Sequence, residues 1–331
     1  MKKILFVCTE RIGDSLTITP CIRSIFDKFR SCEIDLICKQ SNYEVFSGNP
    51  YLNEIFIPNK LKLFLSIFLK KKKKYDLCFC YSVNKLYINY SARVSENVNC
   101  FSNRNLINSN NNIRLFHLAP TNERSSMHIA IEKSKLLAMS NIKVKSYEYD
   151  FFISPRDIHY ADRIRLNLKK NFNKIFSLKL HSDPKKKYRD WPKENFRNLI
   201  SLILKRNPKV AFLVIGSISE KESIDEMSNL FSENVFGFYN QSIKKSAALI
   251  SISDLYIGVD TGMTHIATCF KLPIVGIYHK LNPSSRGGPL NYAKDHSIDM
   301  SHYKNKVINE SDIAIISHTE VFDKVISTKV I

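Results

Sequence analysis

The sequence predicts an α/β fold built from two doubly wound parallel sheets. Short apolar segments typical of buried strands alternate with segments whose apolar residues recur at helical spacing. This alternation occurs in both halves of the chain, and 331 residues provide room for two domains of ordinary size. The hydrophobic content of 44% is normal for a globular protein and argues against extensive disorder.

The first half of the chain contains four candidate strands and a helix with one apolar face. The helix begins at Thr19-Pro20, and its apolar residues return every three or four positions up to Phe29. A polar turn at residues 9–15 separates this helix from the first strand. The expected strands are residues 4–8, 33–38, 52–57 and 77–81.

The second half repeats this organisation after a join that we place near Ser154-Pro155. We therefore expect an N-terminal domain at residues 1–154 and a C-terminal domain at residues 155–331. We also allow for the last helix to pack back on the N-terminal domain. The expected strands are residues 174–180, 210–215, 255–259 and 274–278, and the expected helices are residues 193–205, 246–252, 262–270 and 319–331.

The chain carries 50 Lys and Arg residues against 31 Asp and Glu residues, a formal net charge of +19. Such an excess favours anionic partners such as nucleic acid, an acidic membrane face or phosphorylated substrates. A genome rich in A and T would raise the Lys, Asn and Ile content in the same way, so the charge alone does not choose among these readings. The absence of a recognised nucleic-acid-binding motif argues against nucleic acid.

The cysteines and the start of the chain bear on the compartment. The eight cysteines show neither Cys-x-x-Cys spacing nor a zinc-type Cys/His cluster, and several stand in apolar runs where buried free thiols are usual. We therefore expect a reducing compartment. The apolar start ends at Thr9-Glu10-Arg11, too early for a signal peptide, and no stretch approaches the ~20 apolar residues of a membrane-spanning helix. We expect a cytoplasmic protein that is soluble or lies on a membrane surface.

Ligands of doubly wound sheets bind at the carboxyl ends of the strands, which directs attention to the turns at residues 9–15, 181–192 and 260–265. The sequence contains no Walker loop and no Gly-x-Gly-x-x-Gly, Gly-x-Ser-x-Gly or His-Glu-x-x-His motif. These absences argue against a P-loop NTPase, a typical dinucleotide oxidoreductase, an α/β-hydrolase and a zincin.

The turn at residues 260–265 joins an expected strand to an expected helix. The free N–H groups and positive dipole end of that helix suit an anion, and Gly262 allows a phosphate to approach the backbone closely. Thr261 and Thr264 can donate hydroxyl hydrogen bonds, whereas Asp260 would repel a phosphate and is expected to cap the helix or bind a sugar hydroxyl. A helix cap without a ligand explains the local pattern equally well, and His265 by itself is more typical of packing or capping.

The other two turns carry one candidate residue each. Arg189 stands beside the chain's only Trp and Pro192, where a cation could offset the charge that grows on a diphosphate leaving group. The neighbouring residues Lys185–Lys187 are more typical of a solvated loop. Asp14 follows Gly13 in the first turn, where a carboxylate can cap a helix or take a proton from an attacking hydroxyl. Position alone does not separate these two roles.

Residues 60–74 combine apolar side chains with five consecutive lysines at 70–74. This composition is typical of an element that lies on an anionic membrane surface, where apolar contact and basic charge act together. A core helix followed by a solvated basic loop would give the same pattern, and both interpretations remain open.

Taken together, four segments in order resemble glycosyltransferase family 9, the ADP-heptose:lipopolysaccharide heptosyltransferases. Residues 11–20 resemble its N-terminal signature, and residues 48–55 match the segment after its second strand. Arg189 stands two residues before Trp191-Pro192, where the family has Lys or Arg. The most specific match is residues 258–267, which are close to the family's donor motif.

The resemblance implies a GT-B fold, in which two Rossmann-like domains face a cleft, and an inverting transfer that needs neither a metal nor a cofactor. The N-terminal domain would hold the acceptor and the C-terminal domain the nucleotide sugar, by family default ADP-heptose. Asp14 would act as the base, and Arg189, Thr261 and Gly262 would stabilise the departing diphosphate.

The resemblance also implies further contacts on both substrates. Gly216, Ser217, Asp260 and His265 would contact the donor, with residues 216–217 and 237–238 at loop ends near the base and ribose. Gly13, Lys60 and Lys62 would contact an acidic acceptor, the Kdo sugars of the lipopolysaccharide inner core. Segment 60–74 could then meet the cytoplasmic face of the inner membrane.

The chain departs from the family after the donor motif. Where the family commonly has Phe-Gly-Pro-Thr, this chain continues from Tyr278 to Pro289 with a different sequence, and the loop would border the donor sugar. A different nucleotide sugar, such as a UDP-N-acetylhexosamine, is therefore an alternative donor. A non-catalytic sugar-nucleotide-binding protein of the same fold is a second alternative, against which the presence of Asp14 argues.

Overall fold

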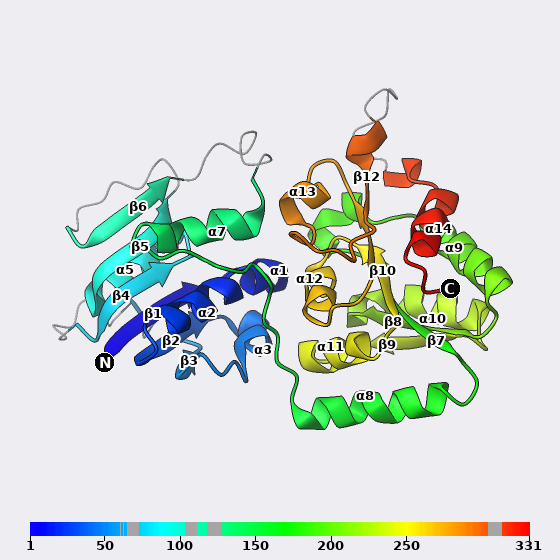
Figure 1. Ribbon diagram of the computed structural model, residues 1–331, viewed down its shortest axis with the longest axis horizontal. Coiled ribbons are helices and arrows are strands. Elements are labelled where there is room, and N and C mark those ends of the chain that lie inside the picture. Colours follow the sequence, from blue (N-terminus) through cyan, green and yellow to red (C-terminus); the bar gives the residue numbers. More distant parts are fainter. Residues whose placement is uncertain (60, 62, 65–72, 103–110, 118–126, 304–312) are drawn as a thin grey trace. The chain divides into compact units, whose positions relative to one another are not determined.

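The computed structural model describes residues 1–59, 61, 63–64, 73–102, 111–117, 127–303 and 313–331. The chain divides into two compact units, Met1–Phe152 and Ile153–Ile331, each with its own parallel sheet (Figure 1). The division falls two residues before the join expected from the sequence, just ahead of Ser154, whose side chain caps the first helix of unit 2. The predicted fold class is confirmed.

Unit 1 contains a six-stranded parallel sheet in the order β3-β2-β1-β4-β5-β6. The order reverses between β1 and β4, which places a topological switch point after β1. The strands are β1 (Lys2–Cys8), β2 (Cys32–Cys38), β3 (Glu54–Phe56), β4 (Tyr75–Cys80), β5 (Ser95–Ser102) and β6 (Ile113–His117). The helices of its described part include α1 (Ile12–Leu16), α2 (Thr19–Lys28), α3 (Tyr43–Phe46), α5 (Lys85–Val94) and α7 (Ile129–Ala138).

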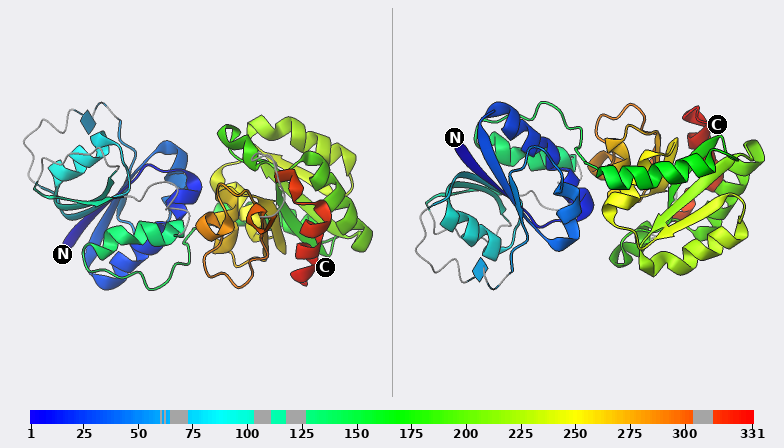
Figure 2. Two further views of the ribbon diagram at one scale, coloured as in Figure 1. Left: turned by 90° about the horizontal axis from the view of Figure 1, so that it is seen from above. Right: turned by 90° about the horizontal axis from the view of Figure 1, so that it is seen from below.

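Unit 2 repeats the same topology in the order β12-β11-β10-β7-β8-β9, with its switch point between β7 and β10. Helices cover both faces of each sheet (Figure 2). The strands are β7 (Lys174–Lys179), β8 (Val210–Gly216), β9 (Val235–Tyr239), β10 (Leu255–Val259), β11 (Ile274–Tyr278) and β12 (Ile298–Asp299). The α-helices are α8 (Pro155–Leu168), α9 (Lys193–Arg206), α10 (Lys221–Leu230), α11 (Ile243–Ser251), α12 (Gly262–Cys269), α13 (Ser284–Gly287) and α14 (His318–Ser327).

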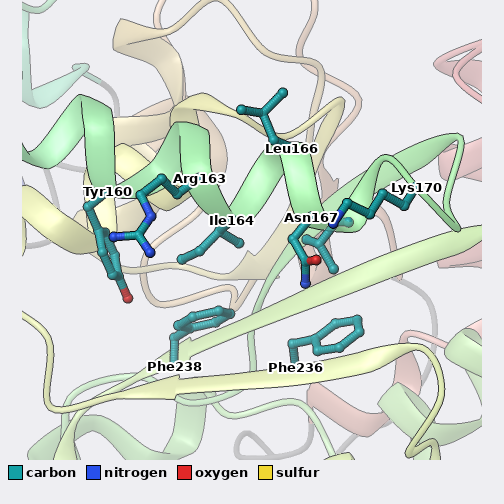
Figure 3. A pocket seen from close by; sticks show the side chains of 9 residues that line it. Tyr160, Arg163, Ile164, Leu166, Asn167, Lys170, Phe236 and Phe238 are labelled. Carbon is teal, nitrogen blue, oxygen red and sulfur yellow. The ribbon is translucent and has the colours of Figure 1, made fainter.

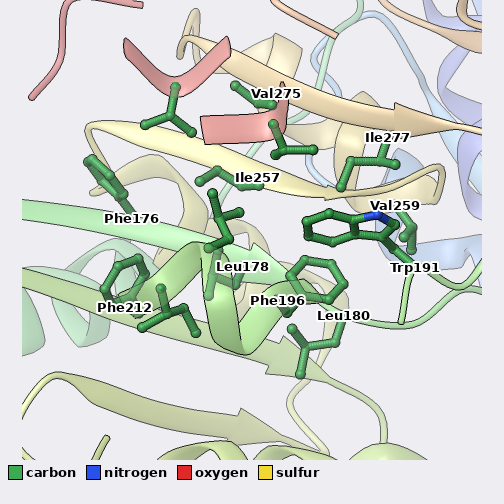
Figure 4. Close-up of a cluster of buried hydrophobic side chains, with 14 of the residues drawn as sticks. Phe176, Leu178, Leu180, Trp191, Phe196, Phe212, Ile257, Val259, Val275 and Ile277 are labelled. Carbon is green, nitrogen blue, oxygen red and sulfur yellow. The ribbon is translucent and has the colours of Figure 1, made fainter. Parts of the chain in front are cut away.

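The core of unit 2 is anchored by Trp191, which is 1% exposed (Figure 4). Its indole packs edge-on against the Phe196 ring, with centroids 4.8 Å apart, and its Nε1 donates to the Ile316 carbonyl oxygen at 2.7 Å. The buried face of α14, Val321 and Val325, belongs to this same core. The last helix therefore contributes to the core of its own unit, and the expectation that it packs back on the N-terminal domain stays a prediction.

The sequence missed elements whose burial depends on tertiary partners. Strand β5 contains Asn99, which is fully buried because its Nδ2 donates to the Leu136 carbonyl oxygen and the Ser140 hydroxyl. Such a strand does not show an apolar pattern. Helices α8 and α10 are largely polar, so their short apolar faces were not recognised. The polar, Asn-rich sequence of residues 103–112 predicts a loop, of which residues 103–110 lie outside the described residues. Among the described residues, no helix combines the length and the apolar character needed to cross a membrane.

Candidate active site

Asp260 lies at the switch point of unit 2, directly after β10, and is 5% exposed. Its Oδ2 accepts from Nη1 of Arg189 at 2.5 Å and from Nδ2 of Asn282 at 2.6 Å. These contacts join the strand end to the loop after β7 and to the loop after β11. A buried carboxylate needs such partners, because an unpaired charge out of water is strongly unfavourable.

Thr261, and not Asp260, caps helix α12. The Thr261 hydroxyl accepts from the Met263 N–H at 3.2 Å. Thr264 is 1% exposed, and its hydroxyl donates inward to the Val259 carbonyl oxygen at 3.1 Å. Of the two roles expected for Asp260, capping the helix is wrong, and binding a sugar hydroxyl stays a prediction. The expectation that the Thr264 hydroxyl is available to a ligand is wrong. Gly262 is the first residue of the helix, and His265, one turn on, is 8% exposed.

Arg189 is held in place by aromatic residues on both sides. Trp191 is buried in the core two positions later, and the guanidinium carbon of Arg189 lies 5.5 Å from the centre of the Tyr188 ring. The Tyr188 ring in turn packs edge-on against the buried ring of His279 at 4.9 Å. The guanidinium therefore stays beside Asp260, whereas Lys185 and Lys187 on the same loop are exposed to solvent.

Lys179 and Glu220 form a second ion pair at the same end of the sheet, which the sequence reasoning missed. Lys179 is the last residue of β7, and Glu220 stands in the short turn after β8. Their side chains are 10% and 11% exposed. Burial lowers the pKa of the Lys179 ammonium below its usual value, although the Glu220 carboxylate opposes this effect. In the sequence, a lysine at the end of an apolar strand is typical of a residue exposed to solvent, so the local pattern does not mark Lys179 as part of a site.

A third pair links His181 to Asp190. The His181 Nδ1 lies 3.3 Å from Oδ2 of Asp190, and the Ser182 N–H donates to Oδ1 at 2.7 Å. Burial by itself would raise the pKa of the Asp190 carboxyl, but these hydrogen bonds outweigh it and hold the pKa below its usual value. The pair closes the turn between β7 and Arg189.

Of the predicted residues, Gly216 is the last of β8 and Ser217 follows it, and both meet Glu220. A side chain at Gly216 would place its Cβ 2.6 Å from Oε2 of Glu220, and the Ser217 hydroxyl donates to Oε1 at 3.0 Å. The resemblance implies that Gly237 and Phe238 stand at a loop end, but both lie within β9. Gly237 faces Ile224 of α10.

Phe238 faces a cavity of about 720 Å³ between α8 and β9 (Figure 3). The cavity is lined by apolar and basic side chains, among them Tyr160, Arg163, Ile164 and Phe236. It lies along the flank of the edge strand, whereas Asp260 and Glu220 stand at the carboxyl ends of the central strands.

Asp14 lies on α1, directly after β1 and at the switch point of unit 1. It is part of the first turn of the helix and is not its cap, which is Arg11. Among the described residues, no donor is hydrogen-bonded to the Asp14 carboxylate, so the oxygens are available to a proton. Gly13 precedes it on the same helix.

Lys133 of α7 is a buried cation at this end of unit 1. It is 7% exposed, and its Nζ lies 3.4 Å from Oε1 of Glu10. Burial would lower the pKa of the ammonium, but the carboxylates of Glu10 and Asp14 outweigh this effect and raise it. Asp14 therefore stands in the field of a fixed positive charge.

The predicted acceptor contacts Lys60 and Lys62 lie outside the described residues. Of the apolar residues around them, Leu63 is buried in the core of unit 1, and Leu61 is 64% exposed. The expectation that no metal is required also remains a prediction. Among the described residues, no group of three His, Cys, Asp or Glu side chains is arranged to hold a metal ion.

Two parallel α/β units with charged clusters at their switch points define a two-domain α/β protein with Rossmann-like sheets, and comparison with known proteins identifies the family. Residues 137–313 match the model of glycosyltransferase family 9 (heptosyltransferase), which is more than half of the chain. The chain belongs to this family and is a glycosyltransferase. The matched segment contains Arg189, Glu220 and Asp260, and Asp14 lies before it.

Two curated relatives are lipopolysaccharide heptosyltransferases. The chain is 29% identical over 139 residues to lipopolysaccharide core heptosyltransferase OpsX of Haemophilus influenzae, a match that covers 41% of this chain and 38% of that protein. It is 23% identical over 278 residues to lipopolysaccharide heptosyltransferase 3 of Escherichia coli, covering 80% of this chain and 79% of that protein.

Solved structures of the family share the fold. A family 9 glycosyltransferase from Veillonella parvula superposes with a TM-score of 0.81 at 16% identity and covers 99% of this chain and 97% of its own. The ADP-heptose lipopolysaccharide heptosyltransferase II of E. coli gives a TM-score of 0.74 at 13% identity, with 99% and 98% covered. These likenesses show that the chain has the fold of the GT-B heptosyltransferases, which consists of two parallel-sheet α/β domains.

Proposed function

We propose that this protein transfers heptose from ADP-heptose to the inner core of lipopolysaccharide, with inversion at the anomeric carbon and without a metal. Family membership supports glycosyl transfer, and the names of the two curated relatives support a lipopolysaccharide acceptor. The observation that carries the proposal is the position of Asp14 and of the Arg189–Asp260 cluster, each at the switch point of a parallel sheet.

In the proposed reaction, Asp14 is the general base. Its carboxylate takes the proton from an acceptor hydroxyl while that oxygen forms a bond to the anomeric carbon of the donor. The bond between this carbon and the diphosphate oxygen breaks, and its electron pair leaves with ADP. A single displacement from the opposite side inverts the configuration. No donor in the described part of the chain is hydrogen-bonded to the Asp14 carboxylate, which supports this role.

The departing diphosphate gains negative charge, which Arg189 and the start of α12 are placed to stabilise. Arg189 has several N–H donors and uses Nη1 for Asp260, so further donors can turn to a phosphate oxygen. The Thr261 hydroxyl and the Gly262 backbone would complete this contact. We propose that these groups supply the positive charge that a metal supplies in other transferases.

Asp260 and Glu220 suit the hydroxyl groups of the donor, since carboxylates repel phosphate and accept hydrogen bonds. Gly216, Ser217 and His265 would border the same donor. Lys60, Lys62 and Gly13 remain proposed contacts of the acidic acceptor. Because such an acceptor is anchored in lipid, we also propose that the protein acts at the cytoplasmic face of the inner membrane.

The decisive test is a coupled assay of ADP release from ADP-heptose with a Kdo-containing lipid A acceptor. We expect Asp14→Asn to lower kcat by about 10²- to 10⁴-fold, the usual contribution of a positioned base. Asp27→Asn, an exposed carboxylate on α2 of the same unit, is the matched control and should retain activity. Full activity of the Asp14→Asn variant would exclude this base and leave a non-catalytic role for the site open.

A different donor is the second candidate, and the loop after β11 favours it. Asn282 of this loop reaches Asp260, so the segment that departs from the family pattern takes part in the predicted donor site. The donor would then be another nucleotide sugar, such as a UDP-N-acetylhexosamine. A panel of donors assayed for nucleotide release decides the matter: turnover of a UDP-sugar without turnover of ADP-heptose would replace the leading proposal.

A further inference from the structure

We propose that Lys179 is a positioning residue of the donor site, and that it acts by holding Glu220 in place. This inference rests on the donor site proposed above. Lys179 ends β7, the strand that borders the switch point of unit 2 on one side, and Gly258 of β10 lies directly opposite it across that point. The lysine therefore stands where ligands of such sheets bind.

The Lys179–Glu220 pair is buried, which points to function more than to stability. Both side chains are about nine-tenths covered, and they are in direct contact. Removing two charges from water costs about as much as their attraction returns, so a well-packed apolar pair would stabilise the unit at least as well. A buried ion pair at the ligand-binding edge of the sheet is therefore best explained by a functional role of the Glu220 carboxylate at that edge.

Two glycines pack closely beside the pair. A Cβ at Gly258 would lie 2.7 Å from Cβ of Lys179, closer than two such carbon atoms approach. A Cβ at Gly216 would lie 2.6 Å from the Glu220 oxygen that contacts Lys179. Neither glycine has a positive φ, so close contacts explain both positions. Gly258 packs against the backbone and Cβ of Lys179, and Gly216 packs against Ile224, whose Cδ1 would lie 2.5 Å from an added Cβ, as well as against Glu220.

The pair also orders the turn that carries the predicted donor residues. One Glu220 oxygen contacts Lys179, and the other accepts from the Ser217 hydroxyl at 3.0 Å. Glu220 thus connects the central strand β7 to the turn at residues 217–220. Without the ammonium, a buried carboxylate would turn toward solvent, and the turn would lose its fixed partner. The ligand group that Glu220 would meet is a hydroxyl of the nucleotide sugar, because a carboxylate repels its phosphates.

The test compares Lys179→Met with Lys193→Met in the full-length protein. Lys193 forms the matched control, since it also pairs with a glutamate of unit 2, Glu226, but both side chains are well exposed, at 46% and 61%. Titration calorimetry with ADP and steady-state kinetics are measured for each variant. We expect Lys179→Met to weaken ADP binding and raise the donor KM by about tenfold, the scale of one lost charge-assisted hydrogen bond, with the acceptor KM unchanged. The Lys193→Met variant should stay within about twofold of the wild type, as expected for an exposed pair.

A second pair of variants separates positioning from a general loss of structure. If Lys179 acts through Glu220, the double variant Lys179→Met/Glu220→Gln binds ADP no more weakly than Glu220→Gln alone. Additive losses, an equal rise of both KM values, or unchanged ADP binding in a folded Lys179→Met variant would overturn the proposal. If Lys179→Met does not fold, unchanged ADP binding by Glu220→Gln overturns it instead.

The same titrations keep this proposal distinct from the proposed donor sugar. Wild-type protein that binds ADP but does not turn over ADP-heptose would refute the sugar assignment, while the variants would still decide the role of Lys179. Wild-type protein that binds neither ADP nor UDP would refute both.

Discussion

Replacing Arg189 by Met would leave the Asp260 carboxylate buried without its cation. Asp260 is 5% exposed, and the Arg189 side chain is 11% exposed, so solvent cannot take the place of the guanidinium. Breaking a buried ion pair by removal of one partner costs about 3–5 kcal/mol. The hydrogen bond from Asn282 remains, so we expect the lower end of this range, about 3 kcal/mol.

The single tryptophan of the chain makes the effect measurable in unit 2 alone. Trp191 lies in the core of that unit, two positions after Arg189, so its fluorescence follows the unfolding of unit 2 and not of unit 1. With a urea m-value of about 1–3 kcal/mol/M, a loss of 3 kcal/mol lowers the midpoint of unfolding by about 1–3 M.

A double variant tests the reasoning directly. In Arg189→Met/Asp260→Asn the carboxylate is also neutralised, so the double variant should be more stable than Arg189→Met. Two results would refute this reasoning. One is that the stability losses of the two substitutions add. The other is that Arg189→Met lowers the urea midpoint by less than about 0.3 M, which is the size of effect usual for an exposed ion pair and not for a buried one.

Two further predictions concern residues around the same site. Replacing Asn282 by Ala removes the second partner of Asp260, and we expect the donor KM to rise about tenfold, with little change in the acceptor KM, when donor turnover is assayed; an unchanged donor KM would separate this loop from donor binding. The pKa of Asp190 is lower in the folded state than in the unfolded state, so its contribution to stability is present above about pH 4 and is lost as the pH falls through the folded pKa. The difference in urea midpoint between the wild type and Asp190→Asn, followed by Trp191 fluorescence, should therefore shrink from pH 6 to pH 3, and a difference that grows on acidification would contradict the stabilising role of the His181 contact.

The local sequence was sufficient to place a strand or a helix wherever the burial of its residues follows a uniform pattern. Strands β10 and β11 are continuous apolar runs that end at polar turns, and their bounds agree with those expected from the sequence. Helix α9 begins at the expected residue because Pro192 precedes an amphipathic segment. The same local pattern could not locate β5, since the burial of Asn99 depends on partners 37 and 41 residues away.

By itself, the sequence determined the two parallel sheets, the turns that carry Asp14 and Asp260, and the resemblance that led to the family. Only the tertiary structure decided which charges meet. Arg189 and Asp260 are 71 residues apart in the chain, and Lys179 and Glu220 are 41 apart. Each pair forms because the strand order brings β7 between β8 and β10, and no local periodicity encodes that order. The roles of Asp260 and Thr261 depended on the same geometry, because a carboxylate held by a buried arginine is no longer available to cap the helix that follows it.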